Sequence, residues 1–70
     1  MHVTAEILPL RREEVVDLRT EATGLDLLRA LRLPPDAHIL VRNDNPIPVD
    51  ESLHDGDTIR VIGVVSGGTP

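Results

Sequence analysis

The feature of this sequence that most constrains its fold is one helical segment with a clear signal at each end. Thr23 is a typical N-cap residue, and the carboxylate of Asp26 suits the positive end of the helix that follows. The leucines of residues 25–31 recur at the spacing of three and four that forms one apolar helix face. Pro34 and Pro35 then remove backbone donors and end the helix. A lone helix of this kind must pack across one face of a sheet built from the rest of the chain.

The segments on both sides of the helix have strand patterns. Residues 2–8 alternate apolar and polar side chains, which indicates a strand with one buried face. After a charged run, residues 15–19 resume a β pattern and predict the return arm of a hairpin. Beyond the helix, residues 38–42 predict a third strand. Residues 47–49 predict a short edge strand, because the prolines in this region cannot donate hydrogen bonds to a ladder.

Residues 58–65 form the longest predicted strand. Apolar side chains occupy both alternating sets of its positions, so we expect burial on much of both faces and a central place in the sheet. Residues 55–57, Asp-Gly-Asp, predict a tight turn before this strand, and residues 43–45 predict the turn between the third and fourth strands. The resulting order β-β-α-β-β-β predicts an α+β fold, in which the first and last strands run parallel in the middle of a mixed sheet.

The absence of cysteine and of aromatic residues limits both the core and the chemistry. A chain of 70 residues, of which 40% are hydrophobic, forms one small domain with an aliphatic core. No disulfide can form, which favours a cytoplasmic location, and no thiol is available for redox chemistry. The apolar runs are too short to cross a bilayer and the first residues lack a signal pattern, so we expect no membrane partner.

The charge balance favours a protein partner. Twelve acidic residues against seven basic ones leave a net charge of −5, whereas a nucleic-acid binder of this size has a basic face. We therefore expect no nucleic-acid partner. Glu51, Asp55 and Asp57 are candidates for contact with a basic protein, unless they serve only as solvated surface. All seven basic residues are arginine, so no lysine side chain is present to accept an isopeptide bond.

No group of residues in the chain predicts catalysis or a metal site. His2, His38 and His54 are scattered over three predicted elements, with no cysteine beside them. Asp55 and Asp57 fit a tight turn, and the ligand series of a calcium loop does not continue after them. No Ser-His-Asp spacing or phosphate-binding glycine loop is present. We therefore expect a protein that is not an enzyme and that holds no bound metal or cofactor.

Two motifs resemble those of a known family. The Asp-Gly-Asp turn at residues 55–57 leads into the last strand, and the pair Gly67-Gly68 lies a few residues beyond that strand. Together they resemble the ubiquitin-like β-grasp proteins, in particular the ThiS and MoaD sulfur carriers and the small archaeal modifier proteins. The resemblance covers nearly the whole chain. It implies a β-grasp domain over residues 1–65 and a C-terminal tail over residues 66–70.

The resemblance also implies a function that depends on the tail. In such proteins an adenylating enzyme uses ATP to activate the carboxylate of the last glycine, and glycines without a Cβ can thread its narrow channel. Gly68 is then the activated carbonyl and Gly67 the threading residue, with Val64, Val65 and Ser66 as contacts at the channel mouth. A sulfur donor converts the adenylate into a thiocarboxylate for a sulfur-accepting enzyme, or a lysine of a target protein attacks it and forms an isopeptide bond.

Two residues follow the glycine pair, Thr69 and Pro70, so the carboxylate of Gly68 is not free in this sequence. Many ubiquitin-like modifiers resemble this arrangement in being cut after the second glycine, which predicts a processing protease acting between Gly68 and Thr69. Otherwise residues 66–70 are an ordinary terminus, or a tail that keeps only a binding role. Because the turn at residues 55–57 also resembles TGS domains, a stand-alone β-grasp interaction module with no C-terminal activation is the alternative function.

A docking patch is predicted beside the last strand. Residues 39–41 are all apolar, so at least one large aliphatic side chain faces outward whichever face of this strand is buried. By resemblance to ubiquitin, Val41 with Val64 or Val65 forms this exposed group, unless Arg42 or a loop covers it. The patch is expected to bind the partner enzyme.

Overall fold

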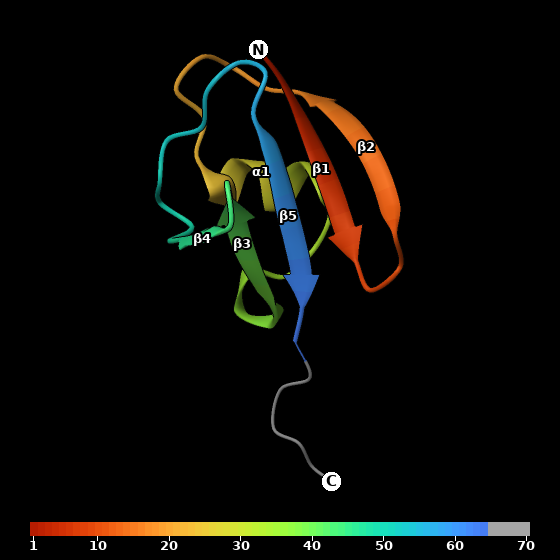
Figure 1. The fold of residues 1–70 in the computed structure, drawn as a ribbon. Coiled ribbons are helices and arrows are strands. Elements are labelled where there is room, and N and C mark those ends of the chain that lie inside the picture. The colour runs from red at the N-terminus through yellow and green to blue at the C-terminus, as the bar shows by residue number, and fades with distance from the viewer. Residues whose placement is uncertain (65–70) are drawn as a thin grey trace, which may run out of the picture.

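The computed structural model describes residues 1–64, which form a single five-stranded sheet with helical segments packed against it. The strands have the order β2-β1-β5-β3-β4 in the sheet (Figure 1). β1 and β5 run parallel, and the other neighbouring pairs run antiparallel. The predicted order of elements and the parallel central pair are confirmed. The elements are β1 His2–Leu8, β2 Arg12–Asp17, α1 Gly24–Leu31, the 3-10 helix η1 Pro35–Ala37, β3 His38–Arg42, β4 Asn45–Ile47 and β5 Thr58–Gly63.

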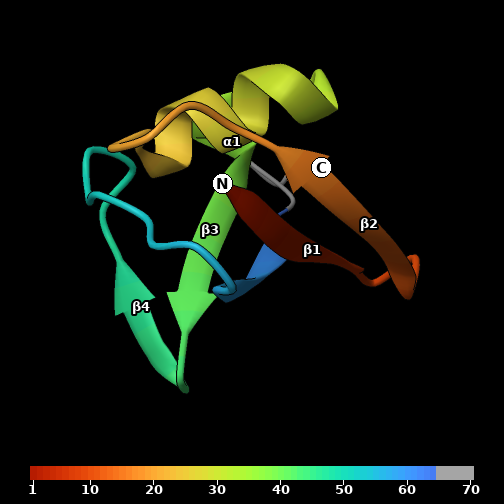
Figure 2. The same cartoon turned by 90° about the horizontal axis from the view of Figure 1, so that it is seen from above.

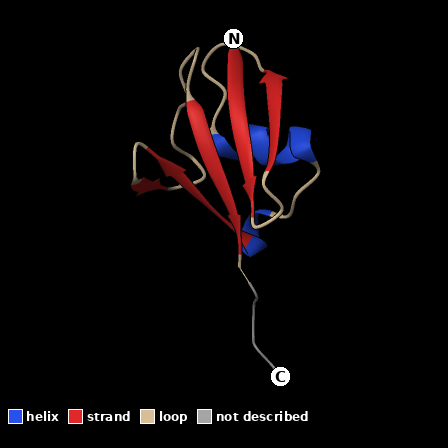
Figure 3. Cartoon of the chain, turned by 45° about the vertical axis from the view of Figure 1, so that its right-hand side comes forward, coloured by secondary structure: helices blue, strands red, loops and turns tan. Residues whose placement is uncertain are grey.

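The helix α1 lies across one face of the sheet and leaves the other face open (Figures 2 and 3). Leu27 and Leu28 of α1 are fully buried, and each contributes about 1.5–3 kcal/mol relative to an exposed leucine. The odd-numbered residues of β1 face this core, as their alternation predicts. The buried core cluster consists of Val3, Ala5, Ile7, Leu27, Leu28, Leu40, Leu53, Ile59 and Val61.

The two ends of α1 are set by local contacts. The backbone N–H of Thr23 donates to Oδ2 of Asp26 at 2.9 Å, which confirms the predicted N-terminus. At the other end Arg32 takes a left-handed conformation with φ of 61°, and the N–H of Leu33 donates to the carbonyl of Leu28 at 2.9 Å. The helix therefore ends before the proline pair. Within residues 1–64, no helix is long and apolar enough to cross a membrane.

Three strands differ from their predicted bounds. β5 covers residues 58–63 rather than 58–65, because Val64 already bonds to Ala37 of η1 and lies outside the strand. β2 covers residues 12–17 rather than 15–19, because backbone pairing with β1 extends into the charged run as far as Arg12 opposite Ile7. β4 covers residues 45–47 rather than 47–49. Two residues in the left-handed region, Asn43 and Asp44, already reverse the chain, so pairing resumes at Asn45. As predicted, β4 is an edge strand.

The prediction that the last strand is buried on both faces is wrong. In β5, Ile59 and Val61 are buried in the core, whereas Arg60 between them is exposed on the open face. The reason is that α1 covers only one face of the sheet. The central position of β5 and the tight turn before it are confirmed, with Gly56 at φ of 86° supplying the left-handed residue of that turn.

Candidate functional site

An apolar row crosses the open face of the sheet near the end of β5. Ile62 of β5 lies opposite Leu8 of β1 on one side and opposite Ile39 of β3 on the other. Residues that pair across neighbouring strands share one face, so these three aliphatic side chains form a continuous row, which we call the apolar row. Ile39 is 45% exposed, and Leu8 and Ile62 are half-buried. The row provides a surface on which a partner protein can pack.

The exposed aliphatic group differs in part from the predicted one. Leu40 is buried in the core, so Ile39 and Val41 belong to the opposite, open face. Of these two, Ile39 is exposed, whereas Val41 is half-buried opposite Arg60 of β5. Val64, just beyond β5, is 37% exposed, as predicted. Partner binding by these residues stays a prediction.

Sequence reasoning did not include the other members of this surface. Leu8 and Ile62 belong to predicted strands but not to the predicted patch. In each strand the alternate positions that include this residue are otherwise polar, so an apolar residue there indicates an apolar side chain on the open face. Leu10, at the tip of the hairpin between β1 and β2, is 71% exposed. Large apolar residues at solvent-facing positions of a strand or turn indicate such a surface in a sequence.

The end of β5 is held between two other elements. The N–H of Val64 donates to the carbonyl of Ala37 in η1 at 2.9 Å, and η1 lies beside the end of β5 (Figure 3). On the other side, Gly63 lies next to the end of β1, where an added Cβ would stand 3.6 Å from the carbonyl oxygen of Leu8. The described chain therefore ends beside the apolar row. The predicted tail residues Val65, Ser66, Gly67, Gly68, Thr69 and Pro70 lie outside the described residues.

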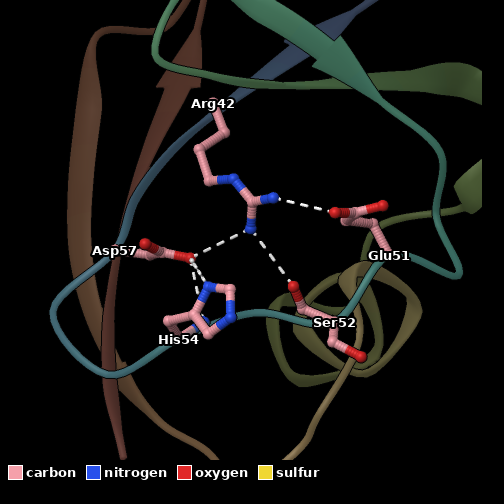
Figure 4. A network of polar contacts seen from close by, with 5 residues as sticks. All are labelled: Arg42, Glu51, Ser52, His54 and Asp57. Carbon is pink, nitrogen blue, oxygen red and sulfur yellow. Dashed lines mark hydrogen bonds and ion pairs between the residues drawn. The ribbon is translucent and has the colours of Figure 1, made fainter.

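The acidic residues predicted to meet a basic partner are used inside the fold (Figure 4). Arg42 of β3 donates from Nη2 to Oε2 of Glu51 at 2.8 Å and from Nη1 to Oδ2 of Asp57 at 3.3 Å. The same Nη1 donates to the carbonyl of Ser52 at 3.1 Å. Asp55 accepts a hydrogen bond from the backbone N–H of His2 at 2.8 Å. These contacts hold the segment before β5, at the opposite end of that strand from Val64.

Arg42 does not cover the apolar row. It shares the core-facing set of positions with Leu40, and its side chain is 18% exposed among the acidic residues of the segment before β5. The open face at the end of β5 is therefore free of this arginine. In residues 1–64, no group of His, Asp and Glu has an arrangement that could hold a metal ion.

The fold and the surface at the end of β5 define the chain as a ubiquitin-like β-grasp protein. The crystal structure of SAMP1 from Haloferax volcanii superimposes with a TM-score of 0.77 at 22% identity, covering 97% of this chain and 100% of that one. A second crystal structure, of the small archaeal modifier protein 1 of H. volcanii, gives a TM-score of 0.76 at 21% identity, covering 91% and 98% of the two chains. These likenesses show the fold.

The sequence comparisons show the family. The family model for small archaeal modifier protein 2 matches residues 1–65. The small archaeal modifier protein 2 of H. volcanii is 31% identical over 68 residues, which cover 97% of this chain and 100% of that protein. The chain belongs to the small archaeal modifier protein 2 family, and it is a ubiquitin-like modifier.

Proposed function

We propose that this modifier acts through Gly68. A protease cuts between Gly68 and Thr69, and the freed carboxylate attacks the α-phosphate of ATP in an activating enzyme, releasing pyrophosphate and leaving an acyl-adenylate. A sulfur nucleophile from a donor then displaces AMP to give a thiocarboxylate, or the amine of a target lysine displaces AMP to give an isopeptide bond. The modifier supplies the reacting group and the partner supplies the catalysis, in the cytoplasm.

The observation that carries this proposal is the position of the glycine pair relative to β5. Gly68 follows Val64 by four residues, and four extended residues span at most about 14 Å. An enzyme that holds Gly68 in its channel must therefore also contact the surface around Val64. The apolar row lies at this end of the open face, where Ile39 is 45% exposed. We assign the row and Val64 to the docking of the activating enzyme, with Val65 and Ser66 leading into its channel.

The mass of the intact protein recovered from its own cells tests this proposal. A chain that ends at Gly68 is expected, either with a thiocarboxylate at its end or as a remnant on lysines of other proteins. Deletion of Gly68 is expected to abolish both the thiocarboxylate and the lysine conjugate. A gene that encodes a chain ending at Gly68 is expected to give both products without the protease. Recovery of only the full chain ending at Pro70, with the adenylating enzyme and sulfur source active, would overturn the proposal.

The presence of Thr69 and Pro70 after the glycine pair also supports a second candidate function. A stand-alone interaction module, similar to a TGS domain, needs no free glycine carboxylate. Such a module binds its partner equally well after deletion of residues 67–70. The modifier loses its activation with the same deletion, so one truncated variant separates the two functions.

A further inference from the structure

A basic cleft lies next to the apolar row on the open face. The hairpin between β1 and β2 and the middle of β5 enclose an open hollow of about 480 Å³, which we call the arginine cleft. Three of the seven basic residues of the chain line it, so its lining has a formal charge of +1 on a chain of net charge −5. The lining residues are Glu6, Leu8, Arg11, Arg12, Glu13 and Arg60.

One of the three arginines forms no ion pair within the described chain. Arg60 pairs through Nε with Oε1 of Glu6 at 3.4 Å and through Nη1 with Oδ1 of Asp44 at 3.3 Å. Arg12 pairs through Nη2 with Oε2 of Glu14 at 3.3 Å. Arg11 is exposed, and it forms no ion pair or side-chain hydrogen bond with any residue from 1 to 64. It therefore offers a guanidinium with free donors at the edge of the cleft.

Two apolar residues of the same region accompany this free cation. Leu10 precedes Arg11 in the hairpin and is 71% exposed. Leu8 lines the cleft itself and belongs to the apolar row. A partner that fits the free guanidinium presents a carboxylate, because guanidinium and carboxylate form strong charge-assisted hydrogen bonds. A partner that also fits the two leucines presents an aliphatic side chain close to that carboxylate.

The position of Arg11 gives this contact a direction. Arg11 lies in the hairpin between β1 and β2, and because β1 and β5 run parallel, this hairpin lies at the same end of the sheet as Val64. At the opposite end, Asp17 is paired with the N-terminal amine at 3.5 Å and Asp57 with Arg42 at 3.3 Å. Attraction between Arg11 and an acidic group of the partner therefore favours docking at the end of the sheet that carries Val64.

We propose that the arginine cleft receives an acidic side chain of the activating enzyme, bound by Arg11, while a neighbouring aliphatic side chain of that enzyme packs on Leu8 and Leu10. This inference rests on the proposed function, because it names the chemistry of the partner surface that guides Gly68 into the channel. The contact lies at the rim of the interface. It acts mainly on the rate of association and is weakened by salt.

The test compares Arg11→Glu with the matched control Arg32→Glu. Both arginines are exposed, both have positive φ, of 54° and 61°, and neither has an ion pair within residues 1–64. Arg32 caps α1 on the covered face, away from the cleft. The two variants therefore change the net charge equally at similar backbone positions, and thermal unfolding shows that each is folded.

The dissociation constant is measured between chains ending at Gly68 and the enzyme that forms their adenylate, identified by pyrophosphate exchange. Arg11→Glu is expected to weaken binding about tenfold at ~0.1 M salt, and Arg32→Glu less than about twofold. The difference is expected to shrink at ~1 M salt, where the screening length falls to about 3 Å. Arg11→Lys, which keeps the charge, is expected to retain most of the affinity.

Each outcome decides the inference. If Arg11→Glu binds the enzyme as tightly as Arg32→Glu, or more tightly, the docking inference is overturned. The proposed function still stands in that case, provided that the wild-type chain ending at Gly68 forms its adenylate. If no adenylate forms on the wild-type chain ending at Gly68, both the proposed function and the docking inference are overturned. A loss specific to Arg11→Glu that salt removes supports the inference.

Discussion

Replacing Gly24 with alanine tests the packing between the helix and the sheet. Gly24 is the first residue of α1 and is buried, and its N–H donates to the carbonyl of Glu51 at 3.1 Å. A Cβ added to Gly24 would collide with Cδ1 of Leu40 and stand 3.2 Å from the carbonyl oxygen of Val49. Leu40 is 1% exposed, so its side chain has no solvent to move into.

Two opposing terms set the size of the effect. Alanine is favoured over glycine by about 1 kcal/mol in a helix interior, so helix propensity alone predicts a more stable Gly24→Ala protein. Overpacking of a filled core costs about 1–3 kcal/mol, and the upper part of that range, about 2–3 kcal/mol, applies here because part of the obstacle is the backbone of Val49. The cost of the collision prevails, and we expect a net loss of about 1–2 kcal/mol in the free energy of unfolding. In a domain of this size that loss lowers Tm by roughly 4–16 °C.

Urea and thermal unfolding of Gly24→Ala measure this loss, with Gly63→Ala as the matched control. A Cβ at Gly63 would meet its nearest atom, the carbonyl oxygen of Leu8, at an ordinary 3.6 Å. We expect Gly63→Ala to change stability by less than about 0.5 kcal/mol.

A double-mutant cycle with Leu40→Ala tests the cause of the Gly24→Ala effect. Leu40→Ala alone costs about 2–5 kcal/mol. Because it also opens the space that the new Cβ needs, the double variant is expected to lose about 1 kcal/mol less than the sum of the two single losses. A Gly24→Ala protein as stable as the wild type, or a cycle in which the losses simply add, would refute the reasoning.

Three further predictions concern local contacts. Arg42→Gln is expected to lower the free energy of unfolding by about 2 kcal/mol in urea, because part-buried acceptors lose their donor; a loss below about 0.5 kcal/mol contradicts this. The hydrogen bond from the backbone of Thr23 holds the pKa of Asp26 below its usual 3.8, so its stabilising effect is complete above that pH and is lost as the pH falls through the lowered pKa. Asp26→Asn is therefore less stable than the wild type at pH 7, and the difference in Tm closes in acid; a difference independent of pH is the contrary result. Asp44→Val is expected to lose about 1–2 kcal/mol, because a β-branched residue is strained at φ of 65°, whereas Asp44→Gly unfolds at nearly the wild-type urea concentration; equal losses in the two variants rule out backbone strain.

The elements that the sequence predicted well are those defined by contacts between near neighbours in the chain. The alternation of residues 2–8, the N-terminus of α1 at Thr23 and the turn around Gly56 follow from side-chain periodicity and backbone geometry. The parallel pairing of β1 with β5 followed from the order of the elements, because a lone helix leaves few ways to close a mixed sheet. The family resemblance carried by Gly67-Gly68 and the turn before β5 was likewise visible in the sequence.

Only the tertiary structure decided which residues form the candidate surface. The choice of Ile39 over Val41 as the exposed aliphatic residue depends on how β3 packs in the sheet, and the apolar row exists only because Leu8 and Ile62 meet across β1 and β5. The ion pairs of Arg42 with the segment before β5, and the free guanidinium of Arg11, likewise depend on residues far apart in the chain. Strand register and charge pairing join segments dozens of residues apart, and no local pattern in the sequence specifies which of these residues meet.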